Sequence, residues 1–68
     1  MKFDLIVQVN TLGKFLKTQN PELREGQSYM NALAEINPEL YKKITGTEAD
    51  CFYDDSKIKN FFDKLVES

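Results

Sequence analysis

The sequence contains no histidine and no tryptophan, and Cys51 is its single cysteine. Without histidine, the base that most often activates a serine or cysteine nucleophile is missing, and so is the usual nitrogen ligand of zinc. A lone cysteine forms no internal disulfide, which favours a reducing compartment and hence the cytoplasm. We therefore predict that the protein is not an enzyme, and we assign no catalytic residue, cofactor or metal ligand.

The chain also lacks an excess of positive charge and a long apolar run. Its formal net charge is −2, so no overall positive field draws it to nucleic acid or anionic lipid. The apolar residues 5–7 are interrupted by Gln8 and Asn10, and no cleavage site follows, so we expect neither a signal peptide nor a membrane span. We expect residues 1–68 to form one small domain of marginal stability. Without a disulfide or a metal site, formation of a homo-oligomer is the remaining way to stabilise so small a core.

Apolar periodicity favours helices. Residues 3–17 place apolar side chains at spacings of four, three and four, typical of one helix face. These are Leu5, Val9, Leu12 and Leu16. Alternate residues from Phe3 to Val9 are also apolar, but a lone strand lacks a partner in the rest of the chain. The predicted fold class is all-α, a small bundle of about four helices, and the alternative is an N-terminal strand followed by three helices.

The tetrapeptide Asn-Pro-Glu-Leu occurs twice, at residues 20–23 and 37–40. Asparagine accepts hydrogen bonds from the free amides of a first helical turn, proline fits the first helical position, and glutamate complements the positive helix end. We predict that each copy opens a helix. The second helix then covers about residues 21–36, and the short third helix ends at Gly46.

Two further positions carry expectations about packing. Gly26 lies on the apolar side of the predicted second helix, where glycine costs helix propensity, so we expect a neighbouring helix to approach closely there. Either Asp55 or Ser56 is expected to cap a fourth helix whose apolar residues recur at helical spacing. These are Ile58, Phe61, Phe62 and Leu65.

The loop of residues 47–55 concentrates carboxylates and an aromatic pair. Its acidic residues are Glu48, Asp50, Asp54 and Asp55. Their spacing does not match a calcium loop and the required glycine is absent, so capping duties or partner recognition are the favoured roles. Cys51 is predicted to be a buried or half-buried apolar filler and not a nucleophile, because a neighbouring carboxylate raises the pKa of a thiol and makes it less reactive.

The aromatic pair leaves two interpretations open. Phe52 and Tyr53 either fill the gap between the third and fourth helices, or Tyr53 anchors a protein partner of unknown identity. The residues predicted to contribute to such a partner contact are Asp50, Phe52, Tyr53, Asp54 and Asp55. Length and an aromatic pair outside any helical stripe both favour a functional loop.

A DNA-associated regulator of the helix-turn-helix type is the alternative function. The predicted second and third helices meet across a short turn at residues 37–38. The third helix would then offer a glutamate, a tyrosine and two lysines, but no arginine for reading bases. We therefore expect no nucleic-acid partner.

Four segments together resemble a pattern found in small uncharacterised bacterial and bacteriophage proteins. They are residues 24–33, residues 37–40, Gly-Thr-Glu-Ala-Asp at 46–50 and Phe-Tyr-Asp-Asp at 52–55. The resemblance implies a prokaryotic or phage setting, and it supplies neither an activity nor site residues. In such proteins a proline is expected before the Phe-Tyr pair, where this chain has Cys51. The predicted function is a non-enzymatic protein–protein interaction or regulatory module, such as a phage accessory factor.

Overall fold

The computed structural model describes the backbone of residues 2–67 and the side chains of residues 4–67. It contains four α-helices and one 3₁₀ turn. They are α1 (Lys2–Gln19), α2 (Glu25–Ile36), α3 (Pro38–Ile44), η1 (Asp55–Lys57) and α4 (Ile58–Glu67). Because residues 2–67 include no strand, the predicted all-α bundle is confirmed and the alternative with an N-terminal strand is wrong. None of these helices is long and apolar enough to cross a membrane.

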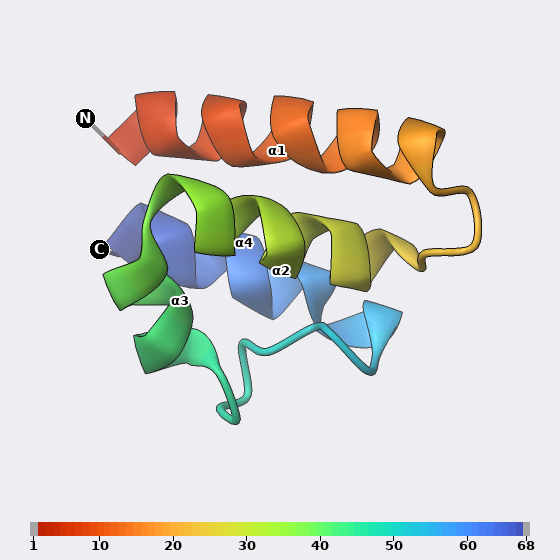
Figure 1. The fold of residues 1–68 in the computed structure, drawn as a ribbon. Coiled ribbons are helices and arrows are strands. Elements are labelled where there is room, and N and C mark those ends of the chain that lie inside the picture. Colours follow the sequence, from red (N-terminus) through yellow and green to blue (C-terminus); the bar gives the residue numbers. More distant parts are fainter. Residues whose placement is uncertain (1, 68) are drawn as a thin grey trace.

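The helices are arranged around α2 (Figure 1). α1 runs antiparallel along one side of α2 and also contacts α4, which lies behind α2 in this view. α3 packs at the C-terminal end of α2, and the chain then passes along the side of α2 that faces away from α1 before it enters η1 and α4. The 47–55 loop and α1 therefore lie on opposite sides of α2.

The core collects side chains from every helix and from the 47–55 loop. The most buried apolar residues are Val9, Tyr29, Met30, Ala32, Leu33, Ile44, Ala49, Cys51, Phe61 and Leu65. Each large side chain buried in this way stabilises the fold by about 1.5–3 kcal/mol relative to an exposed one. Tyr29 joins α2 to α4, because its ring lies 5.0 Å from that of Phe62 and 6.3 Å from that of Phe61.

α1 approaches α2 closely at Gly13. A Cβ at this position would lie 2.5 Å from Cδ1 of Tyr29, so only glycine leaves room for the ring. The hydroxyl of Tyr29 donates a hydrogen bond to Oδ1 of Asn10, one helical turn earlier in α1, at 3.3 Å. The same ring thus fixes α1 by packing and by a polar contact.

The two Asn-Pro-Glu-Leu segments adopt different structures, so the prediction that each opens a helix is wrong for the first. At the second copy, Oδ1 of Asn37 accepts a hydrogen bond from the amide of Leu40 at 3.2 Å and caps α3 as predicted. At the first copy, the amide of Asn20 donates to the carbonyl of Leu16, and residues 20–23 then form a turn. α2 begins at Glu25, four residues after the predicted start.

The predicted helix ends need one further correction. Gly46 has a φ of 81°, the left-handed conformation expected directly after α3. The fourth helix is preceded by η1, which is capped by Asp54 and by neither Asp55 nor Ser56 as predicted. Asp54 serves better because its Oδ1 lies 2.9 Å from the amide of Ser56, two residues later.

Candidate functional site

Three aspartates of the 47–55 loop accept hydrogen bonds from backbone amides. Asp50 binds two amides, that of Gly46 through Oδ2 at 2.8 Å and that of Phe52 through Oδ1 at 3.0 Å. Asp54 binds the amide and the hydroxyl of Ser56, which lowers the pKa of its carboxyl group. These carboxylates therefore hold the loop backbone in place by accepting hydrogen bonds from its amides, which is the capping role expected for them.

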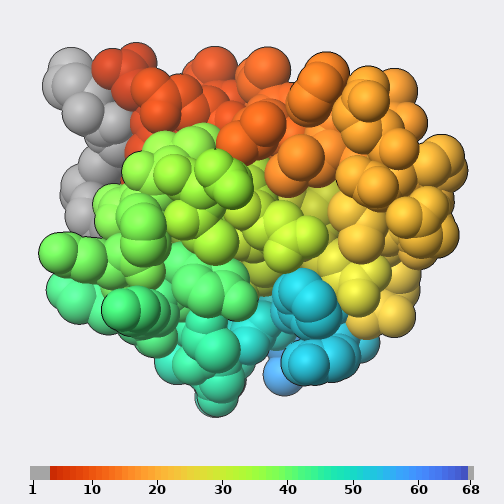
Figure 2. Space-filling model, in the orientation of Figure 1, coloured from red at the N-terminus to blue at the C-terminus, as the bar shows by residue number. Residues whose placement is uncertain are grey.

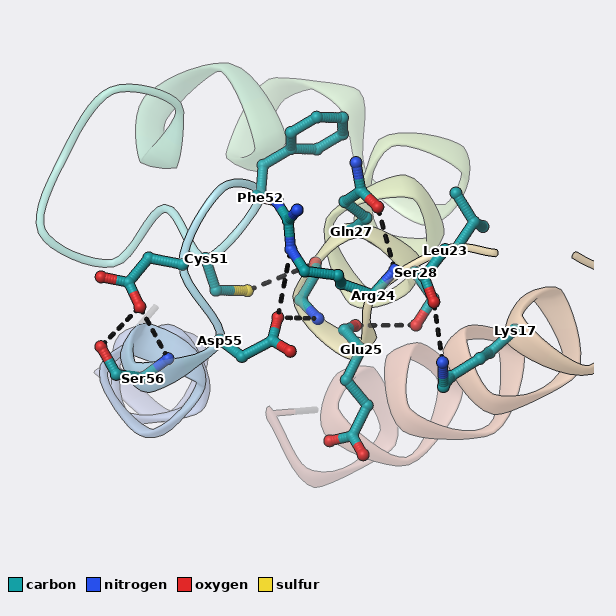
Figure 3. Close-up of polar contacts among 12 residues, drawn as sticks. Lys17, Leu23, Arg24, Glu25, Gln27, Ser28, Cys51, Phe52, Asp55 and Ser56 are labelled. Carbon is teal, nitrogen blue, oxygen red and sulfur yellow. Dashed lines mark hydrogen bonds and ion pairs between the residues drawn. The ribbon is translucent and has the colours of Figure 1, made fainter. Parts of the chain in front are cut away.

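Asp55 and Arg24 tie this loop to the start of α2 (Figure 3). Oδ1 of Asp55 accepts a hydrogen bond from the amide of Gly26 at 3.0 Å, so it satisfies one of the free amides of the first turn of α2. Nη2 of Arg24 donates to the carbonyl of Phe52 at 2.8 Å, and its Nε lies 3.9 Å from Asp55. Arg24 is thus a key residue of the site that the sequence analysis missed, because its partners lie about 30 positions away.

Gly26 is the point where α2 and the loop touch. A Cβ at this position would overlap the carbonyl oxygen of Cys51, so the close approach predicted at Gly26 exists. The neighbour is the loop, however, and not a helix as predicted. Sγ of Cys51 also donates to the carbonyl of Gly26 at 3.4 Å, as Figure 3 shows.

The thiol of Cys51 is buried and unreactive in character. The side chain is 0% exposed, which confirms the predicted buried position. Burial first of all, together with the nearby carboxylates of Asp50 and Asp55, raises the pKa of the thiol to about 12. The thiolate, which is the nucleophilic form, is therefore scarce at neutral pH.

The aromatic pair divides into one packed and one exposed ring. Phe52 is half-buried and packs against the core, which agrees with a filling role. Tyr53 is 81% exposed, so the interpretation that both rings fill the gap is wrong for Tyr53. The two rings meet edge to face, with centroids 4.8 Å apart and an interplanar angle of 67°.

A small hollow of about 110 Å³ adjoins the aromatic pair. Its walls come from α2, α3 and the loop. The lining residues are Met30, Tyr41, Thr45, Asp50, Phe52 and Tyr53. Figure 2 shows the face on which α1 follows the upper edge of the molecule and the loop follows the lower edge. Three of the five predicted contact residues, Asp50, Phe52 and Tyr53, thus line this hollow, and Asp54 and Asp55 follow them along the chain.

Two larger hollows have walls of mixed charge. One of about 550 Å³ lies where α1 turns into α2, and one of about 620 Å³ lies between the start of the loop and α4. In the first, Nζ of Lys17 donates to the carbonyl of Leu23 and the hydroxyl of Ser28 donates to that of Glu25, each at 2.7 Å. Within residues 2–67, no three histidine, cysteine, aspartate or glutamate side chains gather in a way that could hold a metal ion.

Comparisons of this chain with protein-family models, with curated proteins and with solved structures found no match. The exposed charges of the predicted recognition helix are Glu39, Lys42 and Lys43, while Tyr41 is half-buried. A helix-turn-helix role thus stays a prediction.

Proposed function

We propose that this domain acts by contact with another protein, without catalysing a reaction, and that Tyr53 is the centre of the contact surface. The observation that carries the proposal is the 81% exposure of the Tyr53 side chain on a loop that is otherwise hydrogen-bonded in place. Tyrosine combines a large apolar ring with a hydroxyl, which is why it is enriched at protein interfaces and among the residues that dominate binding.

The backbone on both sides of Tyr53 is held by the rest of the domain. The amide of Phe52 is bound by Asp50, its carbonyl is bound by Arg24, and the amide of Asp54 donates to the carbonyl of Cys51 at 3.4 Å. The ring of Tyr53 also leans on that of Phe52. Holding the side chain before binding reduces an ordering cost of about 0.5–1.5 kcal/mol per side chain.

The hollow beside Tyr53 gives a partner a place for one small apolar side chain. Its floor includes Met30, which is 1% exposed and whose unbranched side chain adapts to different shapes. An exposed aromatic ring next to a small apolar depression resembles the centre of known interfaces, where a few residues carry most of the binding free energy.

The test is affinity capture with the wild-type domain and two variants. Bacterial cells, with and without phage, are the source, because the sequence resemblance implies that setting. Tyr53→Ala should lose the captured protein, and its measured affinity should fall at least tenfold, which corresponds to about 1.4 kcal/mol. Val66→Ala is the matched control, because Val66 is also apolar and 48% exposed but lies on α4.

The proposal also requires that Tyr53→Ala leaves folding unchanged. The melting temperature should stay within about 2 °C of the wild type, because an exposed ring contributes little to the core. A captured partner that binds Tyr53→Ala as well as the wild type would contradict the proposal. Tight, steeply salt-dependent binding to duplex DNA would instead support the regulator of the helix-turn-helix type.

A further inference from the structure

The two peptide units that flank Tyr53 are held by hydrogen bonds of different length. Because a peptide unit is planar, a bond to the carbonyl of Phe52 also fixes the plane that contains the amide of Tyr53. Nη2 of Arg24 donates to that carbonyl at 2.8 Å. The peptide unit after Tyr53 is held by the amide of Asp54, which donates to the carbonyl of Cys51 at 3.4 Å. The bond from Arg24 is therefore the shorter of the two that orient Tyr53.

We infer that Arg24 is the positioning residue of the contact surface, which orients Tyr53 for a partner protein without itself binding the partner. This role rests on the proposed function of Tyr53. A guanidinium group suits it, because its nitrogen atoms lie in one rigid plane and can hold two oxygen atoms in a fixed geometry. The two oxygen atoms are the carbonyl of Phe52 and, 3.9 Å from Nε, Oδ1 of Asp55 (Figure 3).

The backbone of Arg24 is anchored independently of its side chain. Its amide donates to Oε1 of Gln27 at 2.9 Å, and its carbonyl accepts a hydrogen bond from the amide of Ser28 at 3.1 Å. The bond between Asp55 and the amide of Gly26 also exists without the guanidinium group. Loss of the Arg24 side chain therefore leaves the first turn of α2 in place, and its main effect should be confined to the loop around Tyr53.

An ordered loop binds more tightly than a mobile one, because less conformational freedom is lost when the partner binds. Without the guanidinium group, the peptide unit before Tyr53 can rotate, and the ring then points in several directions. Only some of these directions would match the partner. The affinity for the partner should thus depend on Arg24 although the contact itself is made by Tyr53.

Nitrogen-15 relaxation of the isolated domain tests the positioning directly. In the wild type, the order parameter of the Tyr53 amide should be about 0.85, as in a rigid backbone, and in Arg24→Ala it should fall below about 0.6. The amides of α2 should keep their values, and circular dichroism should show the same helix content. Lys59→Ala is the matched control, because Lys59 also carries an exposed charge paired with an aspartate, Asp63, but lies on α4.

The affinity for the protein that the wild-type domain captures tests the consequence. Arg24→Ala should weaken binding at least about fivefold, which corresponds to about 1 kcal/mol, and Lys59→Ala should leave it unchanged. Arg24→Lys keeps the charge but lacks the planar group, so it should also lose affinity. Wild-type affinity in Arg24→Lys would mean that the charge alone matters, and it would overturn the inference.

A double-mutant cycle separates positioning from direct contact. In the Tyr53→Ala background there is no ring left to position, so adding Arg24→Ala should change the affinity by less than about twofold. A further fivefold loss in that background would mean that Arg24 binds the partner itself, which would contradict the positioning role.

The same measurements distinguish a failure of this inference from a failure of the proposed function. Wild-type binding by Tyr53→Ala would refute the contact role of Tyr53, and the order parameters would then decide whether Arg24 orders the loop. An unchanged order parameter in Arg24→Ala would refute the inference about Arg24 alone. The same holds for unchanged affinity in Arg24→Ala when Tyr53→Ala has lost binding.

Discussion

Residues 20–23 and residues 37–40 have the same sequence, Asn-Pro-Glu-Leu, and different structures. The second copy opens α3 with the asparagine cap and the proline position that local preferences predict. The first copy is a turn, and the helix that follows it starts only at Glu25. The same local signal is therefore followed in one place and overridden in the other.

The hydrogen bonds that the surrounding residues make with each copy explain the difference. Asn20 completes the end of α1 through the carbonyl of Leu16, and the carbonyl of Leu23 accepts a hydrogen bond from Lys17 in α1. The amide of Gly26, which would bind the carbonyl of Glu22 if a helix began at Pro21, is bound instead by Asp55. At the second copy, the amides of Leu40 and Tyr41 both donate to Asn37, and these hydrogen bonds belong to the start of α3 itself. A cap worth about 1 kcal/mol decides a helix start only where tertiary contacts are weaker.

Gly26→Ala should have the largest effect among changes around the first copy. The new Cβ would overlap the carbonyl oxygen of Cys51, and we expect a loss of about 3 kcal/mol in the free energy of unfolding, measured by urea denaturation. If Gly26 were an ordinary interior position of a helix that began at Pro21, the same change would stabilise the domain by about 1 kcal/mol. A gain in stability would therefore refute the close contact between Gly26 and the carbonyl of Cys51.

Gly46→Ala is the matched control for this glycine. Its φ of 81° disfavours alanine, but nothing lies within 4 Å of the added Cβ, so the expected loss is only about 1 kcal/mol. The two variants separate the cost of a steric overlap from the cost of a left-handed backbone.

Asp55→Ala should have the second largest effect. It removes the acceptor for the amide of Gly26, and we expect a loss of about 1–2 kcal/mol together with faster hydrogen exchange at that amide. Asp63→Ala is the control, because the 3.1 Å ion pair of Asp63 with Lys59 is exposed and its loss costs less than about 0.5 kcal/mol. Equal stability of Asp55→Ala and the wild type would mean that Asp55 does not hold the start of α2.

Replacing the two asparagines compares the tetrapeptides directly. Asn37→Ala removes a side-chain cap and should cost about 1 kcal/mol. Asn20→Ala should cost less than about 0.5 kcal/mol, because the side chain of Asn20 makes only an exposed, 3.4 Å contact with the carbonyl of Leu16. Thermal unfolding followed by circular dichroism measures both. Equal losses would show that the first asparagine has an unseen structural role.

The helices themselves could be predicted from the sequence, because their apolar stripes report burial directly. Val9 and Phe61, for example, come from two predicted stripes, and both lie in the core. The start of α2 could not be predicted, because it depends on Asp55, a residue 29 positions away from Gly26. Gly26 did signal a close approach, but a glycine does not reveal whether a helix or a loop approaches it.

The candidate site was predictable in part. A loop rich in aspartate predicted capping, yet the sequence did not identify which amides are bound, because several amides lie within reach of each carboxylate. The exposure of Tyr53 was also left open, since Phe52 and Tyr53 are adjacent and either ring could have turned inward. The bond between Arg24 and the carbonyl of Phe52 belongs to the folded loop and has no counterpart in any periodic pattern.

Because Cys51 is buried, the reactivity of its thiol can serve as a measure of how often the 47–55 loop opens. This is the single thiol in the sequence, and it belongs to the loop that carries Tyr53 and is buried against Gly26 of α2. An alkylating reagent can reach it only when the loop separates from Gly26, so the rate of alkylation measures how often that separation occurs. Any molecule that binds to the closed loop would slow the alkylation of Cys51. The alkylation rate would therefore detect binding without a label.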